Sequence, residues 1–345
     1  MGCHEKSIRA SHRLEETEML KVLKRRLGLG VAALLSSLAL LAWADGAAAE
    51  NTKLRFAYLL ADSDLPIFVA QKNGAFQAAG LDVELTEVQG GPAVVAAIAS
   101  GSADVGYAAP VPPINARLNG VMVKMVLALG HEVDPDKKFL WLVASKASGA
   151  KDLAGLKGKK IAFNANGSLC ELAWRDHMAK AGLSMDDVQV VILPFPQQEA
   201  ALEQGAIDAT CTVNPFFASM SKNTAIGAQI VASGVLADES KPTLNDVIFA
   251  GDDYIAANAS SIKAFGKVIF ETRNALLANR AELEAAAVEF LQLTPEAAKD
   301  FNLPIVKPEL TVTEADVQIL LDAMKRAGMQ TQDIAAKDFV ANMAP

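Results

Sequence analysis

The sequence predicts an α/β fold with two similar lobes, each a mainly parallel sheet flanked by helices. Strand-like and helix-like segments alternate after residue 50, which is the pattern of parallel sheets with crossover helices. One strand–helix–strand unit occurs twice, starting once at Ala79 and once at Ala181. The chain has 345 residues, of which 51% are hydrophobic, so it can bury one large core or two medium-sized ones.

The first fifty residues have a different composition and predict an export signal. Four basic residues between positions 21 and 26 precede an apolar run from Leu27 to Trp43, and alanines follow at positions 47 to 49. We expect residues 1–49 to be a signal peptide cleaved near Ala49, and residues 1–18, ahead of Met19, to be an over-extended start. A retained anchor is the alternative, although the apolar run is marginal for a membrane-spanning helix.

The charge of the remaining chain excludes two classes of partner. Residues 50–345 carry 25 basic and 35 acidic side chains, which gives a net charge of about −10. A protein this acidic is not expected to bind nucleic acid or an anionic membrane surface. A small anion held locally by a few groups remains open.

The elements of the first lobe follow one another in regular order. Residues 53–60 are apolar and predict a buried strand, and residues 66–76 open with a proline suited to the first turn of a helix. Residues 81–88 alternate between apolar and polar side chains and predict a second strand. A glycine pair then opens an alanine-rich helix, and residues 104–109 predict a third strand. Near the other end of the chain, residues 281–293 predict a helix that packs on this lobe.

The repeated unit predicts the division into lobes. Both copies read Ala-Gly-Leu, strand, turn, helix, Gly-x-x-Asp, strand, so that Gly101 and Asp104 align with Gly205 and Asp208. We therefore expect residues 50–146 and 251–345 to form lobe 1 and residues 147–250 to form lobe 2. The polar, glycine-rich stretch 146–160 is the expected crossing between lobes, with hinges near residues 145–149 and 250–252.

A ligand site is expected where helix starts and strand ends with small side chains meet. The first turn of a helix carries unpaired backbone N–H groups and a partial positive charge, and glycine lets a ligand approach them. In open α/β sheets, ligands lie beyond the carboxyl ends of the strands. Two such faces, one from each lobe, could hold a small, oxygen-rich ligand. Replacing Gly91 by valine is expected to abolish ligand binding at little cost to folding. The candidate ligand-binding residues of the two lobes are Ser63, Leu65, Gly90, Gly91, Ala108, Ala109, Asn166, Gly167, Ser168, Asn214 and Phe216.

Two cysteines, Cys170 and Cys211, lie beyond the predicted signal. An exported protein with an even pair could form one disulfide, but two cysteines do not make a disulfide scaffold. We expect two buried free thiols, with a disulfide as the alternative.

Four stretches carry a family resemblance: "LPIFVAQKNGAFQAAGLDVEL", "GGPAVVAAIASGSADVGYA", "LKGKKIAFNANGS" and "AALEQGAIDATCTVNPF". They resemble the periplasmic substrate-binding proteins of nitrate, taurine and alkanesulfonate ABC importers. The resemblance implies a two-lobed type II periplasmic binding fold that closes on a small organic or inorganic anion. It also implies a periplasmic location and delivery of the solute by a monomer to a membrane permease and its ATPase.

The sequence departs from the family pattern at Asn214. Family members often carry an acidic residue before the Pro-Phe pair, so the amide removes a partner for an amino group and argues against a strict taurine assignment. The loop predicted over residues 130–138 adds His131 and Glu132 as candidate contacts. A solvated histidine side chain is the alternative to a ligand role there.

Two other functions are kept as alternatives. The same fold serves pyrimidine synthases of thiamine biosynthesis, as the resemblance implies, but those enzymes carry a cysteine-rich motif that this chain lacks. The chain also lacks a G-x-S-x-G elbow, a phosphate-binding Gly-Lys-Ser/Thr loop and a zinc-type cysteine cluster. We therefore expect no enzymatic activity, no cofactor and no metal. A ligand-sensing domain for a membrane receptor is the other alternative.

Overall fold

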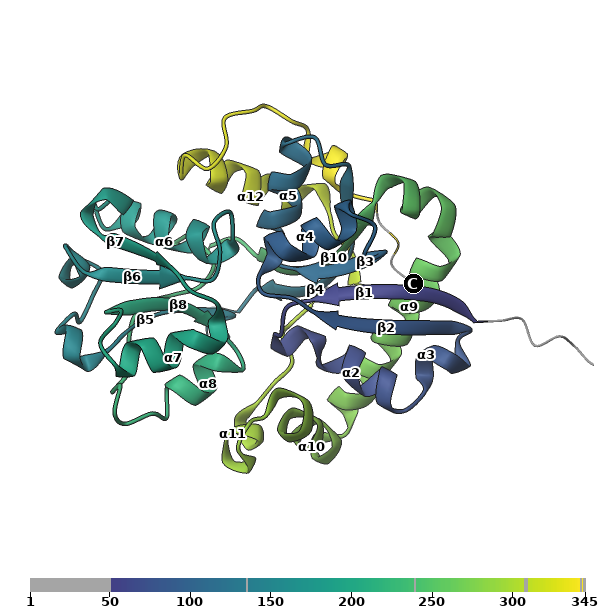
Figure 1. Ribbon diagram of the computed structural model, residues 1–345, viewed down its shortest axis with the longest axis horizontal. Helices are drawn as coiled ribbons and strands as arrows, with labels where there is room; N and C mark the ends of the chain where they lie inside the picture. The colour runs from purple at the N-terminus through teal and green to yellow at the C-terminus, as the bar shows by residue number, and fades with distance from the viewer. Residues whose placement is uncertain (1–50, 135, 239, 307–309, 342, 344–345) are drawn as a thin grey trace, which may run out of the picture. The chain divides into compact units, whose positions relative to one another are not determined.

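A computed structural model describes residues 51–134, 136–238, 240–306, 310–341 and 343. The predicted signal peptide lies outside the described residues. Within the described part of the chain, no helix has both the length and the apolar character needed to cross a membrane. Ten strands form two separate five-stranded sheets within residues 51–345 (Figure 1).

The first sheet combines strands from both ends of the described chain. Its order across the sheet is β2 (Leu81–Glu87), β1 (Thr52–Tyr58), β3 (Val105–Ala108), β10 (Thr243–Gly251) and β4 (Val123–Glu132). β1 pairs in parallel with β2 and β3, whereas β10 runs antiparallel to β3 and β4. The strands bury Leu54, Phe56 and Ile248 among others, so their apolar runs form the centre of the core.

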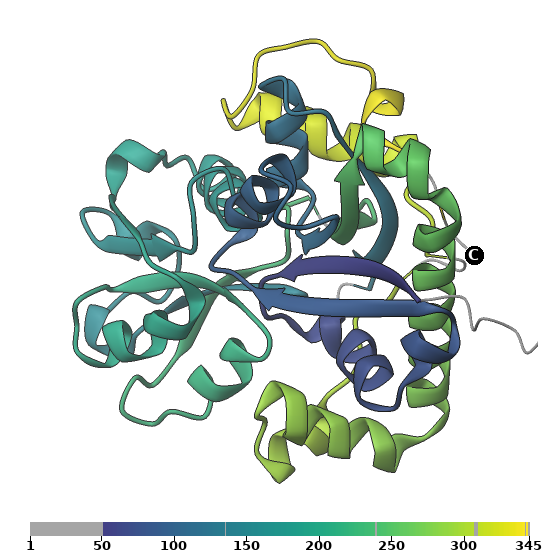
Figure 2. The same ribbon diagram turned by 45° about the vertical axis from the view of Figure 1, so that its right-hand side comes forward.

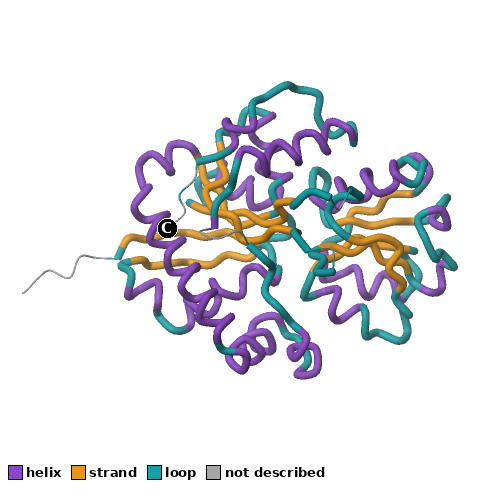
Figure 3. Tube along the Cα trace, turned by 180° about the vertical axis from the view of Figure 1, so that it is seen from behind, coloured by secondary structure: helices purple, strands orange, loops and turns teal. Residues whose placement is uncertain are grey.

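The second sheet repeats this arrangement with strands from the middle of the chain. Its order is β7 (Gln189–Ile192), β6 (Lys160–Phe163), β8 (Ala209–Val213), β5 (Leu140–Ala144) and β9 (Gln229–Ser233). β6 pairs in parallel with β7 and β8, whereas β5 runs antiparallel to β8 and β9. Figure 3 shows the two sheets in orange with loop segments passing between them.

Both sheets are mixed but mainly parallel, as expected. Four of the five strands in each sheet run in one direction, and the fifth, β10 in the first sheet and β5 in the second, runs against them because of the crossings. The chain passes from the first sheet to the second after β4 and returns before β10. A strand that follows a crossing begins at the end of its sheet that faces the other sheet, and runs away from that end. The other strands finish at that end, so β5 and β10 must be antiparallel to their neighbours.

The glycine-rich stretch 146–160 was expected to cross between the lobes, but it does not pass from one sheet to the other. Residues 146–159 join β5 to β6 within the second sheet and contain two short 3₁₀ turns, Lys146–Ser148 and Ala154–Leu156. The segments that change sheets connect β4 to β5 and β9 to β10. The expected division had placed β5 with lobe 1 and most of β10 with lobe 2, whereas strand pairing joins β5 to the second sheet and β10 to the first.

Helices cover both faces of the first sheet. On one face lie α2 (Leu65–Lys72), α3 (Ala75–Ala78) and the long α9 (Asp252–Ala278), and on the other lie α4 (Gly91–Ala99), α5 (Val111–Leu118) and α12 (Glu314–Arg326). Figure 2 shows α9 running along the outer side of this sheet. The single helix expected over residues 66–76 is two helices, because Gly74 adopts a positive φ of 75° between them.

The second sheet is covered by α6 (Leu169–Lys180) on one face and by α7 (Phe195–Glu203) and α8 (Phe216–Met220) on the other. Trp174 of α6 is fully buried and donates from Nε1 to the Ala162 carbonyl at 3.1 Å, which fixes α6 on β6. Two further helices, α10 (Arg280–Leu291) and α11 (Pro295–Asp300), pack against α2 and α9 through Leu65 and Leu283, as expected for the residues 281–293. Three further short 3₁₀ turns are Asp62–Asp64, Met185–Asp187 and Ala336–Phe339.

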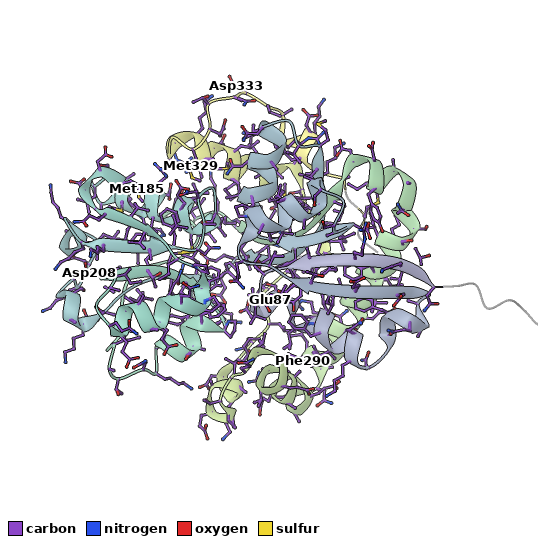
Figure 4. The ribbon with its side chains drawn as sticks, in the orientation of Figure 1. Glu87, Met185, Asp208, Phe290, Met329 and Asp333 are labelled. Carbon is purple, nitrogen blue, oxygen red and sulfur yellow. A yellow bond between two sulfur atoms is a disulfide. The ribbon has the colours of Figure 1, made fainter. Side chains whose placement is uncertain are left out.

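The internal repeat is confirmed by matching hydrogen bonds. Asp104 Oδ2 accepts from the Arg55 amide in the middle of β1, and Asp208 Oδ2 accepts from the Lys160 amide at the start of β6, each at 2.8 Å. Each aspartate amide also donates to the carbonyl of the same strand residue. The conserved geometry shows why Gly-x-x-Asp occurs in both copies. Figure 4 shows Asp208 at the end of the second sheet that lies away from the first.

Cys170 and Cys211 form a disulfide, so the expectation of two free thiols was wrong. Cys170 lies in the first turn of α6 and Cys211 in the middle of β8, against which α6 packs. Their Cα atoms are 5.6 Å apart, within the range that a disulfide spans. The sequence separation of 41 residues concealed this proximity.

Candidate functional site

The ends of the two sheets that face each other enclose a small pocket, which we call the inner pocket. The first sheet contributes Gly91, Tyr107 and Asp246, and the second contributes Ser168 and Phe195. Gly91, Ser168 and Phe195 each follow the carboxyl end of a strand, as expected for a ligand site in this type of fold. The space that remains is about 30 Å³, which is room for about one water molecule. The two sheets therefore lie close together at this edge.

Direct contacts join the two sides around the inner pocket. Asn115 Nδ2 of α5 donates to the Gly167 carbonyl at 3.3 Å. At Gly90, whose φ is 92°, a Cβ would lie 3.3 Å from the Cβ of Ala165 on the other side. A residue with a side chain at Gly90 would therefore crowd the approach of the second sheet, which is a reason for glycine at this position.

A second cavity, the acceptor cavity, adjoins the inner pocket and shares Phe139 with it. It measures about 210 Å³ and is lined by Asp62 and Asn245 from the first sheet's side and by Asn214 and Trp141 from the second. The Asn214 side chain lies close enough to Asp62 to oppose the rise in its pKa, so the two sides also meet here.

Two side chains of the protein itself cap the start of α6. Ser168 is the N-cap, and its hydroxyl accepts from the Glu171 amide at 3.2 Å. Glu171 in turn accepts from the Gly167 amide at 2.7 Å through Oε2. The protein's own carboxylate therefore occupies the position at which an external anion would meet this helix.

Gly91 serves packing at the start of α4. A Cβ at this residue would lie 2.5 Å from Pro112 Cγ and 3.3 Å from Ala108 Cβ. The expectation that Gly91→Val costs little in folding was therefore wrong, because the position has no room for a side chain. Gly91 lines the inner pocket with its backbone.

Four buried polar residues from two distant segments meet between the cavities. Asp62, Ser63 and Asp64 form a 3₁₀ turn after β1, and Asp246 lies in the middle of β10. All four are at most 5% exposed. Ser63 Oγ donates to Asp246 Oδ2, and Tyr107 Oη donates to Asp246 Oδ1 at 2.6 Å.

Burial controls the ionisation of this cluster. It raises the pKa of Asp246 to about 7, against the opposing effect of hydrogen bonds from Ser63, Tyr107 and Asn245. Burial, together with the charge of Asp246, also holds the pKa values of Asp62 and Asp64 well above the ordinary carboxyl range. In the described part of the chain, no lysine or arginine forms an ion pair with any of the three carboxyls.

The remaining predicted site residues lie in varied surroundings. Leu65 and Ala108 are fully buried in the apolar core, and Asn166 is exposed. Ala109 lines the inner pocket, and Phe216 stacks on Phe195 with ring centroids 5.5 Å apart.

His131 is not in a loop, because β4 continues through Glu132. The side chain is buried, and its Nε2 lies 3.5 Å from Asp316 Oδ2. The alternative of a solvated side chain is therefore wrong. His131 and Glu132 both line the acceptor cavity.

Sequence reasoning missed the residues that dominate the polar character of the site: Asp62, Asp64, Tyr107, Asn245 and Asp246. One signal was present, because Asp246 interrupts an otherwise apolar strand and a charge in a buried strand requires partners.

The family model for the NMT1-like family matches residues 47–291. Among curated proteins, a Bacillus subtilis protein named "Putative aliphatic sulfonates-binding protein" is 26% identical over 84% of this chain and 83% of its own length. A 4-amino-5-hydroxymethyl-2-methylpyrimidine phosphate synthase from Aspergillus parasiticus is 25% identical over 73% of each chain.

Solved structures with the same fold include periplasmic binding proteins. The alkanesulfonate-binding protein of Xanthomonas axonopodis pv. citri bound to MOPS superimposes with a TM-score of 0.71 at 21% identity, over 86% of this chain and all of that one. The periplasmic nitrate-binding protein of Synechocystis PCC 6803 gives 0.68 at 15% identity, over 84% of each chain. The expected type II periplasmic binding fold is thereby confirmed.

Proposed function

This chain belongs to the NMT1-like family, and we propose that it is the solute-binding component of an ABC importer. The solute would be captured between the two sheets and passed to a membrane permease and its ATPase. The names of the sulfonate- and nitrate-binding relatives favour a small anion, organic or inorganic. The observation that carries the proposal is the pair of cavities, one mostly apolar and one lined by polar side chains, at the ends of the two sheets that face each other.

The two sheets define the lobes of this proposal. Strand pairing supports a lobe 1 built on β1 to β4 and β10, and a lobe 2 built on β5 to β9. Rotation about the segments between β4 and β5 and between β9 and β10 would open the cavities to solvent. The contacts of Asn115 with Gly167 and of Asn214 with Asp62 would then break on opening and re-form on closure.

We further propose that the protein is exported. The buried disulfide between Cys170 and Cys211 supports this, because disulfides persist in oxidising compartments such as the periplasm. The signal peptide predicted over residues 1–49 supplies the route, and the periplasmic relatives are consistent with it.

A binding protein is favoured over a pyrimidine synthase by the state of the chemistry-bearing side chains. Both cysteines beyond the predicted signal are joined to each other and so provide no free thiol. In the described part of the chain, no three His, Cys, Asp or Glu side chains are arranged to hold a metal ion. Activity assays with pyrimidine precursors would test this alternative directly.

Thermal unfolding of the mature protein, residues 50–345, tests the proposed function. The panel contains alkanesulfonates, aminosulfonates, nitrate, aromatic carboxylates and pyrimidines. A solute at a hundred times its Kd stabilises the native state by about 2.7 kcal/mol, which raises Tm by about 5 °C or more.

A variant that fills the inner pocket controls for non-specific stabilisation. Ala109→Leu places three further carbon atoms in that pocket and should abolish the Tm shift. Ala206→Leu makes the same change at an exposed position and should leave the shift intact. If no compound in the panel shifts Tm, or if Ala109→Leu responds like the wild type, the proposed function is wrong.

A further inference from the structure

The acceptor cavity holds hydrogen-bond acceptors that lack donors. Asp62 Oδ1, Asn214 Oδ1 and Asn245 Oδ1 are buried oxygens without a hydrogen-bond partner within the described residues. All three residues line the same cavity, and Asn245 is fully buried. Leaving a buried polar atom unpaired costs about 1–3 kcal/mol each, so three in one cavity need an explanation.

The charged side chains around the cavity also favour a positively charged ligand. Among the described residues, four acidic side chains line it, together with two lysines and one histidine: Asp62, Glu132, Asp136 and Asp300 with Lys137, Lys138 and His131. The cluster that continues behind Asp62 adds Asp64 and Asp246 without an ion-pair partner among the described residues. Burial raises the pKa of Asp62 and so keeps its proton in the free protein, whereas a positively charged group in the cavity would stabilise its carboxylate form.

We infer that the solute carries a protonated nitrogen, an ammonium or amidinium group, which donates hydrogen bonds to Asp62, Asn214 and Asn245. The inference rests on the proposed function, because it names the chemistry of the solute that the cleft captures. An ammonium group has three donors and no acceptor, which matches three acceptor oxygens. An anionic group elsewhere on the solute is compatible with this assignment, whereas a bare anion such as nitrate is not.

Two further features of the cavity favour a cation. Trp141 lines it and stacks against Phe217 with ring centroids 4.0 Å apart, and an indole ring attracts a cation placed over its face. The cavity of about 210 Å³ accommodates a small amine. The Glu171 carboxylate binds the Gly167 amide just ahead of α6, and its charge disfavours a bare anion there.

Asp62 and Asn214 reach this cavity from the sides of the two different sheets. Asn214 holds Asp62 from the opposite side through its amide, and keeps its own carbonyl oxygen for the solute. One residue from each sheet would then contact the same nitrogen, which couples binding to closure.

Matched probes separate the contribution of the nitrogen from that of the anion. Calorimetric titration of the mature protein uses propane-1-sulfonate, 3-aminopropane-1-sulfonate and propylammonium. Compounds that raise Tm in the wider panel are compared in the same way with analogues that lack the nitrogen. The aminosulfonate is expected to bind about ten- to hundredfold more tightly than the sulfonate, because it adds hydrogen bonds to a charged group.

Asp62→Asn keeps the shape of the side chain and removes its charge. It should abolish the advantage of the nitrogen-bearing probes and leave the affinity for the sulfonate unchanged within twofold. Asp186→Asn removes an exposed carboxylate that lines neither cavity and should change every affinity by less than twofold. Asp62→Asn should also raise the Tm of the free protein, because it removes an unpaired buried carboxyl; a residue with a merely structural role would lower Tm instead.

The outcomes distinguish this inference from the proposed function. If the panel yields binders but nitrogen-free compounds bind as tightly as their amino counterparts, the inference is overturned and the proposed function stands. A lower Tm of free Asp62→Asn, or an unchanged advantage of the amino group in that variant, also overturns the inference. If no compound binds, both are overturned.

Discussion

Replacing Asp246 by asparagine should change how the stability of the free protein depends on pH. Asp246 is 1% exposed and accepts hydrogen bonds from Ser63, Tyr107 and Asn245. Asparagine has the same shape, keeps one oxygen acceptor and cannot ionise. The substitution therefore removes the titration of this carboxyl while preserving the packing of β10.

The direction and size of the effect follow from the raised pKa of Asp246. Burial raises this pKa from 3.8 to about 7, so the native state keeps the proton at pH values where the unfolded chain has lost it. The contribution of the carboxyl to stability is therefore fully present below about pH 4 and is lost as the pH rises through about 7. A shift of about three units corresponds to about 4 kcal/mol at about 1.4 kcal/mol per unit.

Urea unfolding followed by circular dichroism between pH 4 and pH 8 measures this contribution. The free energy of unfolding of Asp246→Asn, relative to the wild type, should increase by up to about 4 kcal/mol across the range. Equal pH dependences of the two proteins would refute the assignment of Asp246 as a buried carboxyl with a raised pKa.

Asp104→Asn provides a control with the opposite sign. Burial raises the pKa of Asp104, but hydrogen bonds and the charge of Arg55 outweigh it and hold this pKa below the ordinary carboxyl value. The contribution of Asp104 is present at neutral pH and is lost as the pH falls through its native pKa. The wild type should therefore have a higher free energy of unfolding than Asp104→Asn at neutral pH, and this difference should shrink as the pH falls.

Three further predictions concern the scaffold. Replacing Cys170 and Cys211 together by alanine should lower the free energy of unfolding by about 4 kcal/mol in urea titrations, because the disulfide closes a long loop, whereas reductant should not affect the double variant. Asp104→Ala and Asp208→Ala should each destabilise the chain by about 1–3 kcal/mol in the same assay, with the larger loss at Asp104, which also binds a guanidinium; equal losses would argue against that extra contribution. Gly91→Ala should cost about 1–3 kcal/mol because its Cβ meets a proline ring, and a wild-type Tm for this variant would contradict the packing argument.

The sequence predicted those features of the fold that depend on local pattern. Gly-x-x-Asp is a local motif, and its two copies revealed a repeat whose glycines, Gly101 and Gly205, both adopt positive φ near 70°. The alternation of strands and helices likewise predicted two sheets of the correct general type. The mixed direction of strands was not predictable from pattern, since β5 and β10 are apolar runs like the others and only the crossings decide their direction.

The polar cluster could not be predicted because it depends on contacts between distant segments. Ser63 and Asp246 are 183 residues apart in sequence and meet only when β10 returns to the first sheet. Aspartates next to a strand are usually solvated, so the run Asp62–Asp64 resembled an ordinary surface turn. The disulfide was missed for the same reason, because α6 had to be placed against β8 before its cysteines could be paired.

A crystal structure of the mature protein grown with its tightest-binding compound tests the central claim most directly. The account predicts one solute molecule enclosed between the two sheets, with its nitrogen within hydrogen-bond distance of Asp62 and Asn214. A solute bound elsewhere would contradict the account. One such place is the hollow of about 320 Å³ lined by Lys180 of α6 and Arg326 of α12.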